Sequence, residues 1–416
     1  MDESKGNLSK AKDTAEDERN RLNAAKSTLE FTVSQRLRRL QLIDMRRFSY
    51  MPGFVCTKCG KKYELSTREP KCKCGGIFDM DFKPPKFDLA LIDKTEWSIF
   101  RYRRFMPLVN ELWRSVTLGE GLSPIIRLDE KTLLKMDYTM PTLSFKDRGA
   151  AVLIWLCKTI GVKSVVQDSS GNAGNSVAAY CAKAGIECEI FVPENTSDKK
   201  VNMIKAHGAS VVIVKGSRDQ TAQECRDKVE TKGIYYASHV FNPVFYEGTK
   251  TYIYEIFEQL GRIPENIFIP LGNGTLFIGV LKALNELKDA GIIRSIPKIF
   301  AVQSERCAPF KAAVDKKEKN ISKIDVLPTM AEGIAIGEPM RAEYILKLVY
   351  EHNVTILTAK EDKILKARHA LASKGIYIEH TTAATYAAYT DYIETYGFLE
   401  GDSILPMCGA GLKSDK

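Results

Sequence analysis

Short apolar runs alternate with longer segments of helical periodicity through most of the chain after residue 163. Strands separated by helices of this length build parallel sheets that are covered on both faces. The runs that predict strands are SVVQDSS (164–170, running into a turn), ECEIFVP (187–193), SVVIVKG (210–216) and NIFIPLG (266–272). The segments that predict helices are 173–185, 201–208, 219–233 and 276–291.

A further helix is predicted to begin near Ser144, and it places a lysine in its first turn. The stretch PTLSFKDRG (141–149) leads into the apolar run AAVLIWLCKTI (150–160), which is typical of a buried helix. The positive end of the helix dipole disfavours the ammonium form of Lys146, and Arg148 adds a second positive charge. We therefore expect a lowered lysine pKa and a free amine. The alternative is a lysine that points outward into solvent.

Two glycine-containing turns each follow a predicted strand and precede a predicted helix, where α/β proteins bind ligands. In DSSGNAGNS (168–176), backbone N–H groups and the hydroxyls of Ser169 and Ser170 can hold a carboxylate. In PLGNGT (270–275), backbone N–H groups can surround a phosphate at a helix N-terminus. The residues of this second turn are Gly272, Asn273, Gly274 and Thr275. Taken alone, either turn is as often a simple chain reversal as a ligand site.

The lysine and the two turns together suit one cofactor. An uncharged lysine, a carboxylate-binding loop and a phosphate cup are the parts needed to hold pyridoxal phosphate covalently as an imine and to move protons on a bound amino acid. The sequence therefore predicts that Lys146 carries this cofactor.

Four cysteines lie within nineteen residues, in CTKCGKKYELSTREPKCKCGG. Two cysteine knuckles separated by twelve residues predict a tetrahedral structural zinc site, with two disulfides as the alternative. The predicted ligands are Cys56, Cys59, Cys72 and Cys74. The other six cysteines are scattered, which is typical of a reducing compartment.

Composition and motifs divide the chain into three predicted regions. The 416 residues, 44% hydrophobic and 27% charged, suffice for more than one folded domain. We predict a charged N-terminal extension (1–50), a zinc ribbon (51–83) and a catalytic region (84–416) with a small subdomain over roughly 163–260. The N-terminus resembles neither a signal nor a transit peptide, and the sequence holds no apolar run of spanning length, so we expect a cytoplasmic protein and no membrane partner.

The formal net charge of +9 is concentrated near the N-terminus. Residues 1–50 carry 11 Lys or Arg against 8 Asp or Glu, and residues 51–86 carry 8 against 4. The catalytic region is therefore close to neutral, and nucleic acid is not the expected partner. A zinc-ribbon binding module on an inactive enzyme scaffold remains as the non-enzymatic alternative.

Several motifs resemble the threonine synthase family, within the tryptophan synthase β-like enzymes of pyridoxal phosphate fold type II. The resemblance covers about residues 51–413. It rests on SFKDRG, SSGNAGNSVAAYCAKAG, NPVFYEGTKTYIYEI, PLGNGT, VQSERCAP, GIYIEHTTAATYAA and MCGAGLK. It implies an α/β fold of two doubly wound sheet domains, preceded by the ribbon and a helical or flexible extension. We also expect a homodimer that acts on a small amino acid.

The resemblance implies individual roles. Lys146 is the imine lysine, Asn172 the partner of the cofactor's phenolic oxygen, and 272–275 the phosphate cup. Cys408 stands where the family usually places a threonine or serine beside the pyridine nitrogen, and a thiol leaves that nitrogen largely unprotonated. The residues implied to bind the substrate carboxylate are Ser169, Ser170, Gly171, Asn172 and Ala173.

Departures from the family pattern leave the substrate open. Positions that hold the substrate phosphate in threonine synthases are apolar here, and apolar groups cannot satisfy a buried dianion. These positions are Ala173, Val240, Phe245 and Leu276. TMAEGIAIG (329–337) resembles the serine and threonine dehydratases instead. Arg148 and Lys250 are candidate anion-binding groups, with a purely structural role as the alternative.

The expected reaction is elimination or replacement at the β or γ carbon of a small L-amino acid. Threonine formation from O-phosphohomoserine is the nearest family activity. The alternatives are β-replacement, as in cysteate synthase, and an ammonia-lyase or dehydratase reaction on an unphosphorylated amino acid.

Overall fold

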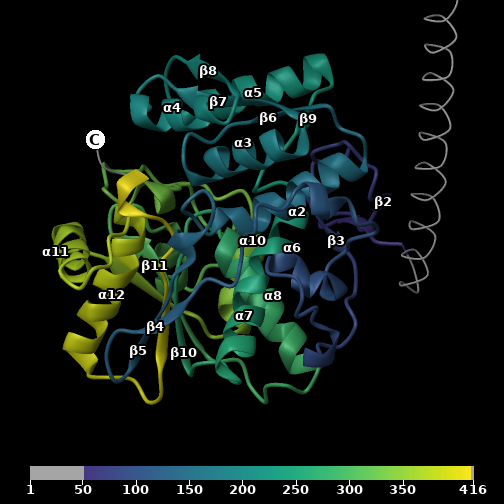
Figure 1. Cartoon of the computed structure of the whole chain (residues 1–416). Coiled ribbons are helices and arrows are strands. Elements are labelled where there is room, and N and C mark those ends of the chain that lie inside the picture. The colour runs from purple at the N-terminus through teal and green to yellow at the C-terminus, as the bar shows by residue number, and fades with distance from the viewer. Residues whose placement is uncertain (1–50, 414–416) are drawn as a thin grey trace, which may run out of the picture. The chain divides into compact units, whose positions relative to one another are not determined.

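The computed structural model describes residues 51–413 and contains three sheets within them (Figure 1). The predicted extension over residues 1–50 lies outside the described part. The strands are β1 (Gly53–Cys56), β2 (Lys62–Glu64), β3 (Phe78–Asp81), β4 (Ile125–Arg127), β5 (Thr132–Lys135), β6 (Ser164–Gln167), β7 (Glu187–Pro193), β8 (Ser210–Val214), β9 (Tyr235–Tyr236), β10 (Asn266–Pro270), β11 (Lys298–Ser304), β12 (Thr355–Ala359) and β13 (Ser403–Pro406).

The helices alternate with these strands, as the sequence predicts. They are α2 (Lys146–Thr159), α3 (Asn172–Ala184), α4 (Asp198–Ala206), α5 (Arg218–Lys232), α6 (Val244–Thr249), α7 (Thr251–Leu260), α8 (Thr275–Asp289), α9 (Pro309–Asp315), α10 (Ala342–Glu351), α11 (Glu361–Ala372) and α12 (His380–Tyr396). Short 3-10 turns occur at 89–91, 99–105, 112–115, 137–139, 332–334 and 411–413. None of the helices described in residues 51–413 combines the length and apolar character needed to cross a bilayer.

The larger sheet has six strands in the order β12-β11-β10-β13-β5-β4. All neighbours run parallel except β4 and β5, which are antiparallel. The central strand β10 is buried along its whole length, and all of its residues after Asn266 are apolar. On this sheet Phe268 stacks on Phe300 with ring centroids 4.4 Å apart, and Tyr389 of α12 meets Phe268 edge to face. Helix α12 is thereby fixed on one face.

The smaller sheet has four parallel strands in the order β8-β7-β6-β9. It gathers with α3, α4 and α5 at the top of Figure 1. Helix α3 ends at Gly185, whose φ of 68° is left-handed, so the predicted glycine stop is confirmed. Both sheets and their covering helices confirm the predicted α/β class.

Helix α2 connects the two sheets, because it packs against α3 on one side and against α6 on the other. Helices α6 and α7 pack in turn on α8, beside the larger sheet. The four-stranded sheet itself ends at Tyr236. The predicted subdomain boundary near residue 260 stays a prediction.

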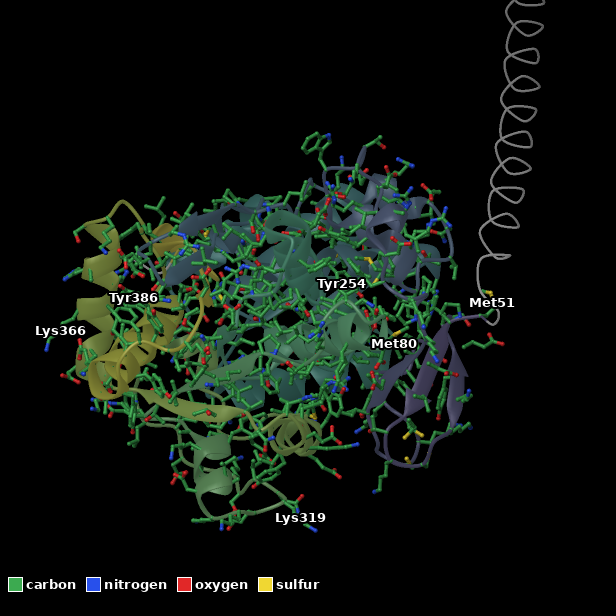
Figure 2. All side chains as sticks on the ribbon, turned by 90° about the horizontal axis from the view of Figure 1, so that it is seen from below. Met51, Met80, Tyr254, Lys319, Lys366 and Tyr386 are labelled. Atoms are coloured by element: carbon green, nitrogen blue, oxygen red, sulfur yellow. The ribbon has the colours of Figure 1, made fainter. Side chains whose placement is uncertain are left out.

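The cysteine-rich segment forms a three-stranded antiparallel sheet in the order β2-β1-β3. Its small core consists of Phe54 and Phe78, whose rings lie 5.8 Å apart, and Met80 on β3 (Figure 2). Arg68 and Arg341 bond it to the catalytic region, through the carbonyls of Ile160 and Phe78 respectively. The ribbon is therefore docked on the catalytic region.

Four buried charges lie directly behind the start of α2. The Arg148 guanidinium donates to Asp137 at 2.8 Å and to Glu255 at 2.6 and 2.8 Å, and Lys135 pairs with Glu255 at 2.8 Å. All four side chains are 0% exposed. Burial alone would raise the pKa of Glu255, but the two cations hold it at about 2. The formal charges of the four groups cancel.

Lys250 belongs to a second buried cluster. Its amine pairs with Glu247 at 2.7 Å and with Glu286 at 3.0 Å, and Lys282 also reaches Glu247. The amine of Lys250 also donates to the carbonyl of Phe105 at 2.7 Å. Arg148 and Lys250 are therefore structural cations, and the structural alternative is the correct one for both.

Replacing Arg148 tests how much the buried network contributes to stability. Arg148→Met leaves Asp137 and Glu255 buried without their main cation, so the free energy of unfolding should fall by about 3–5 kcal/mol. Lys366→Gln is the matched control, since Lys366 is 79% exposed, projects from α11 (Figure 2) and pairs loosely with Asp362. It should cost less than about 1 kcal/mol. Equal losses in denaturant titrations of the two variants would contradict the role assigned to the network.

Candidate active site

A cavity of about 730 Å³ is lined by the residues that the sequence assigned to cofactor binding and to the substrate carboxylate. It is lined by the first turn of α2, by the loops that follow β6 and β10, and by the segment after β13. The predicted residues that line it are Lys146, Ser169, Ser170, Gly171, Asn172, Ala173, Gly272, Asn273, Gly274, Thr275 and Cys408.

Helix α2 begins at Lys146, two residues after the predicted start near Ser144, and Lys146 lies in its first turn as predicted. Its backbone N–H donates to the Ser144 hydroxyl at 3.3 Å, and its amine donates to the Thr275 hydroxyl at 2.7 Å. Burial lowers the pKa of Lys146 to about 8. Desolvation, rather than the helix dipole invoked from the sequence, is the main cause. The amine therefore joins the start of α2 to the turn that follows β10.

Two positions of the turn at 272–275, Gly272 and Gly274, require glycine. A Cβ on Gly272 would lie 2.9 Å from the Ile334 Cα, and Gly274 has a left-handed φ of 74°. Helix α8 begins at Thr275, so its positive end opens into the cavity. The turn can accept a phosphate against its backbone N–H groups.

The loop at 169–173 leads into α3, which begins at Asn172. The Asn172 amide donates to the Glu379 carboxylate at 2.8 Å. Burial raises the pKa of Glu379, and the bond from Asn172 partly offsets that effect. Glu379 lies close against Gly409, because a Cβ at that glycine would collide with the carboxylate. The side chain of Asn172 is thereby directed along the cavity wall.

Cys408 follows β13 and closes the cavity beside α2. Its carbonyl accepts from the Phe145 N–H at 3.0 Å, which ties it to the residue before Lys146. Burial raises the pKa of the Cys408 thiol well above its usual range, so the thiol is neutral. It is a weak donor facing the same space as Lys146.

The cavity also contains charged and titratable groups that sequence reasoning missed. They come from helices α4, α5, α11 and α12 and from several loops and 3-10 turns. No local pattern sets them apart from ordinary surface residues. They are Lys200, Arg218, His239, Arg306, Glu332, Glu361, Glu379, His380 and Lys413. A search for charged residues just beyond strand ends would have found Arg306, which follows β11, and Glu361, which follows β12.

The apolar positions identified from the sequence separate into two pairs. Ala173 and Leu276 line the cavity, whereas Val240 and Phe245 do not. Phe245 is fully buried and lies against Gly149 of α2, where a Cβ would strike its ring. It therefore serves packing between α6 and α2.

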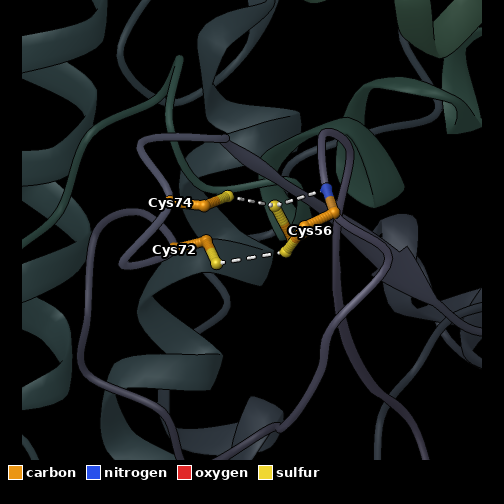
Figure 3. A group of neighbouring side chains, drawn as sticks. Cys56, Cys72 and Cys74 are labelled. Atoms are coloured by element: carbon orange, nitrogen blue, oxygen red, sulfur yellow. Dashed lines mark hydrogen bonds between the residues drawn. The ribbon is translucent and has the colours of Figure 1, made fainter.

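The four cysteines of the ribbon converge (Figure 3). Their sulfur atoms all lie within 4.8 Å of one another, with Cys56 3.5 Å from Cys74 and Cys59 3.6 Å from Cys72. These separations far exceed a disulfide bond of about 2.05 Å. Tyr63 lies 3.1 Å from the Cys72 sulfur, as a further polar group around the cluster. The geometry suits four thiolates around one metal ion.

Comparisons with known proteins identify the family. Residues 116–409 match the family of pyridoxal-phosphate dependent enzymes. The threonine synthase of Methanocaldococcus jannaschii is 31% identical over 375 residues, covering 86% of this chain and 92% of the relative. That of Methanosarcina acetivorans is 31% identical over 354 residues, covering 82% and 86% respectively.

Solved structures support the fold. The processed form of threonine deaminase isoform 2 from Solanum lycopersicum has a TM-score of 0.63 at 23% identity, over 79% of this chain and 86% of that one. A fungal L-serine ammonia-lyase from Rhizomucor miehei has a TM-score of 0.62 at 21% identity, over 70% and 94%. With a lysine-bearing cavity and relatives that span nearly its whole length, the chain belongs to the pyridoxal-phosphate-dependent enzymes and is threonine-synthase-like.

Proposed function

We propose that this enzyme catalyses elimination or replacement at the β or γ carbon of a small L-amino acid, with Lys146 as the catalytic base. The observation that carries the proposal is the partly buried Lys146 amine, which has a pKa of about 8, bonds to the turn at 272–275 and shares a cavity with the loop at 169–173. A base with a pKa near the working pH moves protons most effectively.

The residues of the cavity fit pyridoxal phosphate. The turn at 272–275 would hold its phosphate, and Lys146 would bind it covalently. Asn172 and Cys408 would contact the phenolic oxygen and the ring nitrogen. The loop at 169–173 would hold the carboxylate of the amino acid through its N–H groups and hydroxyls.

The bound cofactor withdraws electrons from the amino acid and makes its Cα proton acidic. Once the amino group of the substrate has displaced it from the cofactor, the Lys146 amine would remove and return that proton, and the carboxylate loop would hold the amino acid with the proton toward the amine. Cys408 stays neutral, so it supplies no charge that would hold a proton on the ring nitrogen. This arrangement favours loss or exchange of a side-chain group over transamination.

The relatives indicate which reaction to test first. Those named above are threonine synthases, so threonine formation from a phosphorylated homoserine is the nearest activity. Release of phosphate without free ammonia from such substrates supports it. Ammonia from an unphosphorylated hydroxy-amino acid instead supports the lyase or dehydratase alternative, and neither product from any such substrate contradicts both. The proposal of an inactive scaffold is disfavoured, because the lysine and both turns converge in one cavity.

We also propose that the ribbon cysteines hold one structural zinc ion. Four thiolates complete a tetrahedral shell and leave no position for a reacting water. The short strands β1 to β3 bury few side chains, so the metal would supply much of the ribbon's folding energy.

Lys146→Ala tests the covalent role. The variant should still bind the cofactor through the 272–275 turn, but borohydride should fix the cofactor only to the native chain. Turnover should fall by at least about 10²–10⁴-fold, because the base is lost. Peptide mapping of the reduced native protein localises the label. A labelled peptide without Lys146, or normal turnover by the variant, would show that another residue binds the cofactor and acts as the base.

The pH dependence of cofactor attachment tests the depressed pKa. Only the free amine attacks, and the pKa of Lys146 is lowered from 10.5 to about 8 by burial. The attachment rate should therefore rise about tenfold per pH unit below pH 8 and level off above it. Absorbance on mixing apoenzyme with cofactor measures the rate. A rate that keeps climbing to pH 10 would mean that the amine has its ordinary pKa.

Cys56→Ser tests the metal site. With one thiolate replaced, zinc content should fall and the thermal midpoint should drop, while the folded remainder still binds cofactor. Cys188→Ser is the matched control, since Cys188 lies on β7 outside the cluster. Full occupancy of zinc in Cys56→Ser, or a well-folded native protein without any metal, would argue against the site.

A further inference from the structure

We propose that Arg218 and His239 form a subsite for an oxoanion carried by the amino-acid substrate or by a second reactant. The inference rests on the proposed function and specifies the chemistry of its unassigned reactant. Both residues line the catalytic cavity, and they come from elements that contribute neither the phosphate turn nor the carboxylate loop.

Arg218 is a cation without a partner in the described part of the chain. It opens α5, where the Ser217 hydroxyl accepts from the Gln220 N–H and the Gln220 side chain accepts from the Ser217 N–H. This capping box fixes the backbone from which the guanidinium extends. The guanidinium itself forms no ion pair within residues 51–413, and its planar fork suits two oxygens of a phosphate, sulfonate or carboxylate.

His239 provides a second, independent sign of a ligand. It is only 7% exposed, and its Nδ1 is buried without a hydrogen-bond partner. Leaving such an atom unsatisfied costs about 1–3 kcal/mol, which a ligand group could recover. Burial lowers the pKa of His239 well below 6.5, so the ring is neutral and has one N–H to donate.

The segment that carries His239 is held in place before any ligand binds. The Arg341 guanidinium donates to the carbonyls of Val240 at 2.9 Å and Phe241 at 2.8 Å. The Tyr246 hydroxyl also donates to the Val240 carbonyl, at 2.7 Å. The Phe245 ring meets the imidazole edge to face, with centroids 5.9 Å apart. A ligand would find the imidazole already oriented.

Besides Lys146, the other three cationic side chains that line the cavity with Arg218 each have a hydrogen-bond or ion-pair partner within the protein. Lys200 pairs with Glu332 at 2.7 Å, Arg306 donates to the Pro328 carbonyl at 2.6 Å, and Lys413 donates to the Thr142 carbonyl at 2.6 Å.

The cofactor phosphate and the amino-acid carboxylate have their own turns in the proposed function. Arg218 and His239 therefore remain for a third anionic group, and they supply polar contacts that the apolar Ala173 and Leu276 cannot.

The test measures binding of sulfate and inorganic phosphate to the holoenzyme through the visible absorption of the cofactor, at constant ionic strength. In Arg218→Gln the anion Kd should rise at least tenfold, and in His239→Phe severalfold. Arg226→Gln is the control, because Arg226 lies on the same helix but does not line the cavity. Its Kd should stay within twofold of the native value.

Kinetics with two kinds of reactant then separate the sources of the oxoanion. If the amino acid carries it, Arg218→Gln should raise the KM for O-phosphoserine or O-phosphohomoserine and leave that for serine unchanged. If the second reactant carries it, only the KM for an oxoanionic nucleophile such as sulfite should rise.

Unchanged anion Kd values in both variants, or an equal rise in Arg226→Gln, would overturn the subsite. The proposed function would survive that result as long as borohydride still labels Lys146 in the same preparations. An enzyme without any covalent cofactor would instead refute the proposed function itself.

Discussion

The pairing of Arg148 with Asp137 and Glu255 is the interaction on which the active site depends. Four fully buried charges, including Lys135, join β5 to the first turn of α2 and to α7. Removing one partner leaves the others unpaired in a medium that solvates them poorly, so the arrangement has few low-energy alternatives. Because Arg148 is two residues from Lys146, the network fixes the helix turn from which the catalytic amine extends.

The neighbouring Asp147 adds a second anchor on the opposite side. Its carboxylate accepts from the Thr142 N–H at 2.7 Å and from the hydroxyls of Thr142 and Ser176. Ser176 lies in α3, so Asp147 connects α2 to the helices of the smaller sheet. Arg148 connects α2 to the larger sheet. Lys146 alone of the three points into the cavity. Asp147 and Arg148 thus hold the first turn of α2 in place, and the Lys146 amine remains available for chemistry.

The ribbon is linked to the same site through Arg341. Its guanidinium, 2% exposed, bonds at once to Phe78 of β3 and to Val240 and Phe241 beside His239. Arg341 therefore links the ribbon to the segment that carries His239, which lines the catalytic cavity.

The sequence by itself determined the alternation of strands and helices between residues 164 and 291, the cysteine cluster, and the two turns and lysine of the cavity. These features depend on local periodicity, on glycines and on spacing along the chain. All three can be read from the sequence without knowledge of the tertiary structure. Only the folded chain decided what the charged residues do. Arg148 pairs with Glu255 and Lys250 with Glu286, both remote in sequence, whereas Arg218 and His239 reach the cavity from separate elements. Charge pairing and desolvation act between residues that no local pattern relates.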